Sequence, residues 1–401
     1  MGRMLIGVFA MVSVSNGAAP DRAPSAQPPQ SAESAAPAEQ PQMVLLYYGF
    51  DANGPRDWLA DRLRHYLAYH VDRGTEKQRP VDTLFDTVLW MYRTSSRGRL
   101  FETSARHEPT SETDWRECMD RLFAPNLQLN ALETAAASLE RELGRPVRVN
   151  VVLTLPYPDV RIANWSDSPD GPKWDFRRDD EGRRQAVRWY IREALQRWQA
   201  ARFGHLRLLG FYWFNEGHAN LRTAEDVPDE ALRTDVTLIQ DTARFIHSLN
   251  VDGRPLTLSW IPYSPYGQDR LPVVRDLMAA PAEARVDYLM IQPNYFFARW
   301  KKQREDLVRI VRNAASVGAG VELECDEALV KDEAMRQRWL EYLEVVSTEH
   351  PGWRQTPVSC YQGLRAVHEM ATRPELARCY DALYEFLKTH RGDTKSPQDR
   401  P

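Results

Sequence analysis

Three glutamates, Glu216, Glu322 and Glu324, are the residues of this 401-residue chain whose types and spacing best suit acid–base chemistry. Glu216 follows the aromatic residues 211–214 and Asn215, as expected where the carboxyl end of a buried strand opens into a site. Glu322 and Glu324 alternate with apolar residues, so both belong to one face of a strand. Glycoside hydrolysis requires such a pair of carboxyl groups, one protonated and one ionised.

The three carboxyl groups suit different roles. Glu216 is the candidate general acid/base, and Glu324 is the preferred nucleophile because it lies nearer the end of its strand than Glu322. Glu322 is then a deeper neighbour that contacts substrate or raises a neighbouring pKa by like-charge repulsion. The choice between Glu322 and Glu324 stays open. A structural alternative also remains, in which residues 211–217 form a core strand with a polar end and residues 320–326 an exposed edge strand.

The candidate substrate-binding residues are polar or aromatic and lie close to expected strand ends, where a barrel enzyme has its site. They are Tyr48, Trp213, Asn215, Trp260, Tyr263, Gln292, Asn294, Tyr295, Tyr361 and Glu322. Aromatic rings among them can stack on the apolar C–H faces of sugars. Strict alternation would put Trp213 and Asn215 on the strand face opposite Glu216, so Asn215 reaches the site with Glu216 only if the strand bulges there.

Strand and helix patterns alternate through the chain and would position these residues. Eight strands are expected at residues 43–48, 84–92, 147–155, 206–214, 256–261, 288–291, 320–324 and 358–361. Helices are expected at residues 58–67, 112–122, 130–143, 183–201, 228–249, 273–278, 301–315, 333–346 and 374–387. This order predicts an α/β fold, a (β/α)8 TIM barrel, with an extended loop at residues 159–180 after strand three. A doubly wound sheet is the alternative, but no strand precedes a glycine-rich nucleotide-binding loop.

The chain divides into four expected segments. Residues 1–19 resemble a signal peptide, with Arg3 before a short apolar run and small residues at the end, and a disordered cytosolic tail is the alternative. The proline- and alanine-rich residues 20–42 suit a disordered linker, residues 43–390 one catalytic barrel domain, and residues 391–401 a disordered tail. We therefore expect a secreted or periplasmic protein. No later stretch is long and apolar enough for a membrane span.

Composition and cysteine spacing exclude several classes of partner. The net charge is -4, from 52 basic and 56 acidic residues without a long basic block, so nucleic acid is not an expected partner. The four cysteines have no zinc-site spacing, so we expect neither a metal nor another cofactor. A disulfide is possible in an exported protein, and Cys360 and Cys379 are the closest pair in sequence. The oligomeric state stays open.

Four strand-end segments together resemble a known family. They are residues 211–216, 261–263, 292–296 and 320–326. The set is similar to a bacterial family of secreted barrel proteins catalogued as a domain of unknown function, and more broadly to retaining glycosidase barrels with catalytic glutamates on strands four and seven. The likeness covers most of residues 43–390 and implies an acid/base at Glu216 and a nucleophile at Glu324. It implies no particular sugar, and Glu322 adds a third carboxyl group to the usual pair.

These observations support two hypotheses from different classes. The first is an exported glycoside hydrolase that cleaves a polysaccharide or glycan with two carboxyl groups, with retention of the anomeric configuration preferred and inversion left open. The second is a barrel that binds carbohydrate without turnover. Replacing Glu216 by glutamine distinguishes them, because the amide keeps the shape of the side chain but cannot supply the proton.

Overall fold

The computed structural model describes residues 40–51, 54–102, 106–178, 180–216, 229–263, 271–297 and 301–392, and the side chains of residues 229–234 and 271–272 are not described. The expected signal peptide, nearly all of the expected linker, and residues 393–401 of the expected tail lie outside these ranges. The described residues from 40 to 392 belong to one compact unit.

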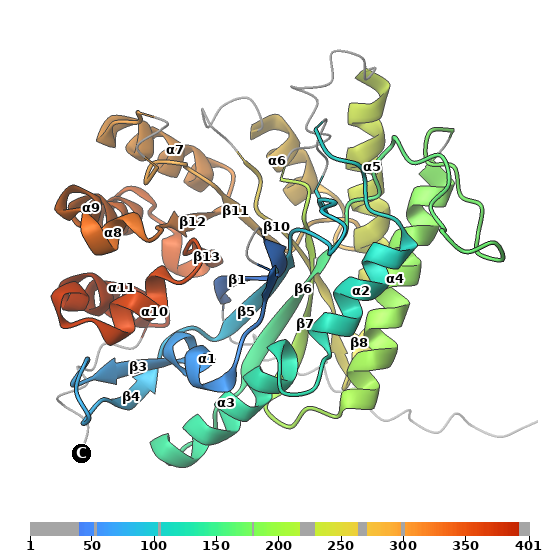
Figure 1. Cartoon of the computed structure of the whole chain (residues 1–401). Helices are drawn as coiled ribbons and strands as arrows, with labels where there is room; N and C mark the ends of the chain where they lie inside the picture. The colour runs from blue at the N-terminus through green and yellow to red at the C-terminus, as the bar shows by residue number, and fades with distance from the viewer. Residues whose placement is uncertain are drawn as a thin grey trace, which may run out of the picture. The chain divides into compact units, whose positions relative to one another are not determined.

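Eight parallel strands close into a barrel (Figure 1). They are β1 (Gln42–Asp51), β5 (Thr87–Tyr92), β6 (Val149–Leu155), β7 (Leu206–Trp213), β10 (Thr257–Trp260), β11 (Tyr288–Ile291), β12 (Gly320–Glu324) and β13 (Val358–Tyr361). Each strand pairs with the next in chain order, and β13 pairs with β1 from Gln42 opposite Val358. This closure confirms the predicted (β/α)8 TIM barrel and excludes the doubly wound sheet.

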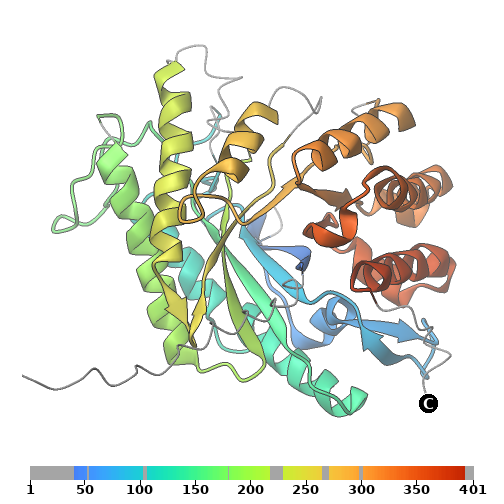
Figure 2. The ribbon, with the colours of Figure 1, turned by 180° about the vertical axis from the view of Figure 1, so that it is seen from behind.

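Helices surround the barrel, as the front and back views show (Figures 1 and 2). They are α1 (Ala60–Leu67), α2 (Glu112–Leu122), α3 (Gln128–Leu143), α4 (Asp180–Ala201), α5 (Asp229–His247), α6 (Leu271–Ala279), α7 (Arg304–Ser316), α8 (Ala328–Lys331), α9 (Glu333–Glu349), α10 (Ala366–Thr372) and α11 (Ala377–His390). Short 3-10 turns lie at η3 (Trp353–Gln355) and η4 (Pro374–Leu376). Across the described ranges, no helix has both the length and the apolar character needed to cross a membrane.

Local sequence explains where these elements lie. All six residues of β5 are buried, as expected for a parallel strand covered on both faces. Helix α9 buries its apolar residues against the barrel, and Asp332 caps its first turn by accepting a hydrogen bond from the Ala334 N–H. Helix α3 ends at Gly144, whose φ of 64° is left-handed and therefore suits glycine.

Some elements differ from the sequence-based expectations. Strand β2 (Gly54–Arg56) pairs antiparallel with the far end of β1, and a second hairpin joins β3 (Ala68–Val71) to β4 (Arg79–Thr83). A short pair, β8 (Asn250–Val251) and β9 (Arg254–Pro255), follows α5. Such short strands lack the apolar periodicity of the barrel strands, and the expected closing helix is split into η4 and α11.

Two further expectations concern particular groups. The Cys360–Cys379 disulfide considered above is wrong, because all four cysteines are buried free thiols. Residues 156–178 do form a long loop after β6, as expected. Its Trp165 is fully buried and stacks on Trp174 at 5.0 Å between ring centroids, so this tryptophan anchors the loop.

Candidate active site

The three candidate glutamates line one cavity at the carboxyl ends of the barrel strands. The cavity has a volume of about 160 Å³ and is lined by Tyr47, Arg93, Glu102, Phe214, Glu216, Tyr263, Gln292, Asn294, Phe297, Glu322, Glu324 and Tyr361. Of the residues selected from sequence, the fold therefore brings together Glu216, Glu322, Glu324, Tyr263, Gln292, Asn294 and Tyr361. Strands far apart in sequence contribute these side chains to one place because all eight carboxyl ends meet at one rim.

Glu324 lies at the end of β12 among groups that favour its ionised form. The Tyr342 hydroxyl donates to its Oε2 at 2.9 Å, and the backbone N–H groups of Asn294 and Tyr295 also donate to this carboxylate. The Lys302 ammonium is near enough to lower its pKa as well. Burial outweighs these contacts and raises the pKa of Glu324 to about 8.

The backbone after β11 helps to form this anion site. Asn294 has a φ of 54°, in the left-handed region that asparagine tolerates better than most residues. It supplies one of the two consecutive N–H groups that point at Glu324. Consecutive N–H groups directed at one point form a concavity that binds negative charge.

Glu216 has acidic as well as donor groups among its neighbours. Burial is the largest cause that raises its pKa to about 8, followed by repulsion from Glu102 and, more weakly, from Glu324. The Gln292 side chain and Arg93 oppose this shift. The backbone of the residue is held by the Tyr263 N–H, which donates to the Glu216 carbonyl at 3.0 Å. Glu216 is therefore suited to carry a proton near neutral pH.

Glu322 lies deeper in the same cavity and is 2% exposed. Its Oε1 has no hydrogen-bond partner among the described residues. Burial, then repulsion from Glu324 and Glu216, raise its pKa well above the usual range. The Ser359 side chain opposes this shift only in part, whereas Glu324 has three donors, so Glu322 is less suitable than Glu324 to act as an anionic nucleophile.

Two charged residues of the cavity were not selected from the sequence. Arg93 follows β5 directly, and its Nε lies 3.8 Å from Glu102 Oε1 in the loop beyond. Arg93 lies at the end of a strand, so the position that identified the other candidates could have identified Arg93 as well. Glu102 lies nine positions later without any local pattern, and burial raises its pKa. Together with Lys302, whose pKa burial lowers to about 8, Arg93 supplies the cationic side of the site.

The fold does not bring five of the selected residues into the cavity wall. They are Tyr48, Trp213, Asn215, Trp260 and Tyr295. Alternation along each strand explains most of them, because Phe214 and Glu216 face the cavity and Trp213 and Asn215 lie on the other face. The register irregularity between β6 and β7 lies opposite Val151 and Val152, so none is found at Asn215.

The contacts of these side chains fit positions in the surrounding wall. Trp260 Nε1 donates to the Asn215 carbonyl at 3.0 Å, and the Tyr48 hydroxyl lies 3.2 Å from Cys118 Sγ. The Tyr295 hydroxyl donates to Glu341 at 2.5 Å, so only its backbone N–H reaches Glu324. Trp260 and Tyr295 thus lie behind the lining of this cavity, whereas Tyr48 lines the neighbouring cavity formed by the end of β1.

Metal ligation was not expected from the sequence. Over the described part of the chain, no group of three or more His, Cys, Asp or Glu side chains is arranged to hold a metal ion.

Comparison with solved structures finds glycosidase barrels at low sequence identity. A GH18 chitinase from Pseudoalteromonas aurantia is 12% identical, with 86% of this chain and 99% of that chain covered and a TM-score of 0.42. Two fungal β-1,4-galactanases, described together, give 12% identity, 85% and 99% coverage and a TM-score of 0.44. A psychrophilic family 10 endo-β-1,4-xylanase gives 10% identity, 75% and 89% coverage and a TM-score of 0.42.

A search of curated proteins finds no match. The family described as "Domain of unknown function (DUF4855)" matches residues 42–385, which is nearly the whole barrel. The chain therefore belongs to the DUF4855 family.

Proposed function

We propose that this protein is a glycoside hydrolase that cleaves a glycan by a two-carboxylate mechanism. The observation that carries the proposal is the cavity at the barrel rim, where Glu216, Glu322 and Glu324 meet in unequal surroundings. Buried like charges destabilise the fold. A barrel without a catalytic role would therefore be more stable with apolar residues at these positions. The pKa values of Glu216 and Glu324 are both raised to about 8, but the donors that stabilise a carboxylate gather on Glu324, and this asymmetry suits an acid/base and a nucleophile.

In this proposal Glu216 is the acid/base and Glu324 the nucleophile. Glu216 faces Glu102 and Glu324, and both favour its protonated form. Glu324 accepts from Tyr342 and from two backbone N–H groups, which favour its ionised form. Glu216 would protonate the leaving oxygen while Glu324 attacks the anomeric carbon. Water, deprotonated by Glu216, would then release the sugar with its configuration retained.

We also propose that the enzyme is exported and acts outside the cytoplasm. This part rests on the sequence of residues 1–19, with its positive charge, short apolar run and small residues. Amino-terminal sequencing of the protein recovered from outside the cytoplasm tests it, and a mature end close to residue 20 is the expected result.

The test of activity is a screen of the purified protein against a panel of polysaccharides and aryl glycosides. The wild type is compared with Glu216→Gln and Glu324→Ala, and with Glu344→Gln as a matched control, because the Glu344 side chain is 60% exposed on α9. We expect loss of turnover by about 100-fold or more in the two site variants and unchanged turnover in the control. Equal rates in Glu216→Gln and wild type would refute the assigned acid.

Azide separates the two proposed roles. A small anion can replace a missing nucleophile or intercept the glycosyl intermediate when the acid/base is missing. Glu324→Ala should therefore give a glycosyl azide of inverted configuration and Glu216→Gln one of retained configuration, as read by NMR. Glycan binding without turnover, unaffected by Glu216→Gln, would instead identify a carbohydrate-binding barrel.

A further inference from the structure

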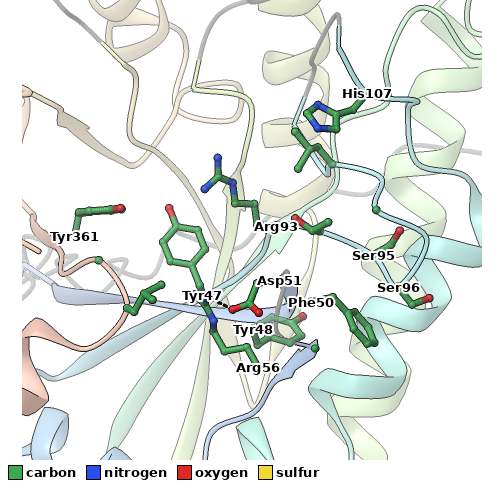
Figure 3. A pocket seen from close by; sticks show the side chains of 16 residues that line it. Tyr47, Tyr48, Phe50, Asp51, Arg56, Arg93, Ser95, Ser96, His107 and Tyr361 are labelled. Carbon is green, nitrogen blue, oxygen red and sulfur yellow. Dashed lines mark hydrogen bonds and ion pairs between the residues drawn. The ribbon is translucent and has the colours of Figure 1, made fainter. Parts of the chain in front are cut away.

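A second cavity lies beside the candidate active site. It has a volume of about 760 Å³ and is formed by the end of β1, strand β2, the loop after β5 and the loop after β13 (Figure 3). It is several times larger than the cavity that holds the three glutamates. None of those glutamates lines it, so the proposed catalytic groups do not account for it.

The two cavities adjoin one another. Tyr47, Arg93 and Tyr361 line both of them. The rings of Tyr47 and Tyr361 meet edge to face with centroids 6.1 Å apart. In Figure 3 the Tyr47 ring lies between Tyr361 and Arg93. These three side chains therefore stand where the two cavities meet, so a ligand that extends from one cavity to the other would contact them.

Regular backbone structure holds one wall of the second cavity in place. Strand β1 runs beyond the barrel and pairs with β2, and an ion pair of 2.6 Å joins Asp51 to Arg56 across this hairpin. The Phe50 N–H donates to the Thr94 carbonyl at 3.1 Å and ties the hairpin to the loop after β5. Gly49 permits this approach, because its φ is 112° and an added Cβ would lie 2.9 Å from the Thr94 oxygen.

The loop after β13 contributes an exposed apolar side chain to the cavity. Leu364 is 49% exposed, one of two large hydrophobic side chains so exposed in the described part of the chain. The backbone at Leu364 is fixed, because Glu327 Oε1 accepts hydrogen bonds from the N–H groups of Leu364 and Arg365 at 2.8 and 2.7 Å. A cavity with a fixed apolar group on the loop after β13 and hydroxyl groups such as Ser95 and Ser96 on the loop after β5 suits a sugar ring, which has apolar C–H faces and polar edges.

We propose that this second cavity binds a further sugar unit of the same glycan, so that the enzyme acts on a chain and not on a single terminal sugar with a small leaving group. The proposal rests on the proposed function of the neighbouring glutamates. Leu364 and Tyr361 contact the ring faces, and Arg93 with Tyr47 contacts the linkage between the two sugars. The substrate class is an oligosaccharide or polysaccharide long enough to fill both cavities.

Binding to the inactive Glu216→Gln protein tests this without turnover. The probes are cellohexaose, xylohexaose, galactohexaose and chitohexaose, each compared with its own monosaccharide by isothermal titration calorimetry. We expect at least one hexasaccharide to bind ten times or more tightly than its monosaccharide. Adding Leu364→Ala should weaken that binding about three- to tenfold through lost apolar contact. Leu59→Ala is the matched control, because Leu59 is 52% exposed and outside both cavities, and it should have no effect.

The outcomes separate this inference from the proposed function. Equal affinity for hexasaccharides and monosaccharides, absence of binding by all four probes, or equal effects of Leu364→Ala and Leu59→Ala would overturn the inference. Length-dependent binding that Leu364→Ala weakens supports it, even if the wild type releases no reducing ends and the hydrolase proposal fails. Wild-type hydrolysis of aryl monoglycosides as fast as of chains, unchanged by Leu364→Ala, would leave the hydrolase standing and refute the second sugar site.

Discussion

Replacing Glu216 by glutamine should stabilise the folded protein at alkaline pH while it removes activity. Burial and the neighbouring carboxyl groups raise the pKa of Glu216 to about 8, above the ordinary 4.5. Between pH 4.5 and 8, Glu216 therefore keeps its proton in the folded state but is ionised in the unfolded state. The stability linked to this proton is complete below pH 4.5 and is lost as pH rises toward 8.

The size of the effect follows from this pKa difference. The pKa of Glu216 rises from 4.5 in the unfolded state to about 8 in the folded state. The protein therefore loses about 5 kcal/mol of unfolding free energy as the pH rises between these two values. Glu102 and Glu324 share the repulsion with Glu216, so a single replacement recovers part of this sum, roughly 2 to 5 kcal/mol. Glutamine is neutral in both states and has no such pH dependence.

Urea unfolding followed by tryptophan fluorescence measures this difference. Wild type and Glu216→Gln should unfold with similar free energies at pH 5, and the variant should be more stable by roughly 2 to 5 kcal/mol at pH 8.5. Glu344→Gln, on the exposed face of α9, should follow the wild type at both pH values. Parallel pH dependence of wild type and Glu216→Gln would refute the claim that this carboxyl group is held protonated.

Three further predictions concern other parts of the barrel. Tyr342→Phe removes a hydroxyl that donates to Glu324 at 2.9 Å, so the pKa of this carboxyl should rise and the acidic limb of kcat/KM should move up by about one pH unit. Burial lowers the pKa of His65 to about 3, so stability should fall as pH drops from 6.5 toward 3, and His65→Gln should lose about 2 kcal/mol less than wild type between pH 7 and pH 4.5 in urea unfolding. Arg183→Met leaves Asp235 buried without its 2.5 Å partner and should cost about 3 to 5 kcal/mol in the same assay.

Each of these has a result that would contradict it. An acidic limb unchanged in Tyr342→Phe would mean that this hydroxyl does not stabilise the ionised form of Glu324. Identical acid sensitivity of His65→Gln and wild type would mean that this imidazole does not resist protonation. A loss below about 1 kcal/mol in Arg183→Met would show that Asp235 finds another partner or becomes neutral without cost.

The local sequence pattern was sufficient to predict features that depend only on the alternation of side chains along a strand. The strand boundaries at residues 288–291, 320–324 and 358–361 agree with β11, β12 and β13. Glu322 and Glu324 share the cavity because side chains alternate along a strand and the barrel interior lies on one side. Alternation likewise explains why Phe214 lines the cavity with Glu216 while Trp213 does not.

The aromatic strand of residues 211–214 that ends in Asn215 and Glu216 was thus identifiable from sequence alone, as were the order of eight strands and the resemblance to a family of barrels. Only the tertiary structure put Arg93, Glu102 and Lys302 around Glu216 and Glu324, joined Tyr342 to Glu324, and opened a second cavity beside Tyr47. The physical reason is that a strand's period is local, whereas electrostatic partners meet through space when the barrel closes. A carboxyl group's pKa depends on those partners and on its burial, which no neighbouring residue in sequence reveals.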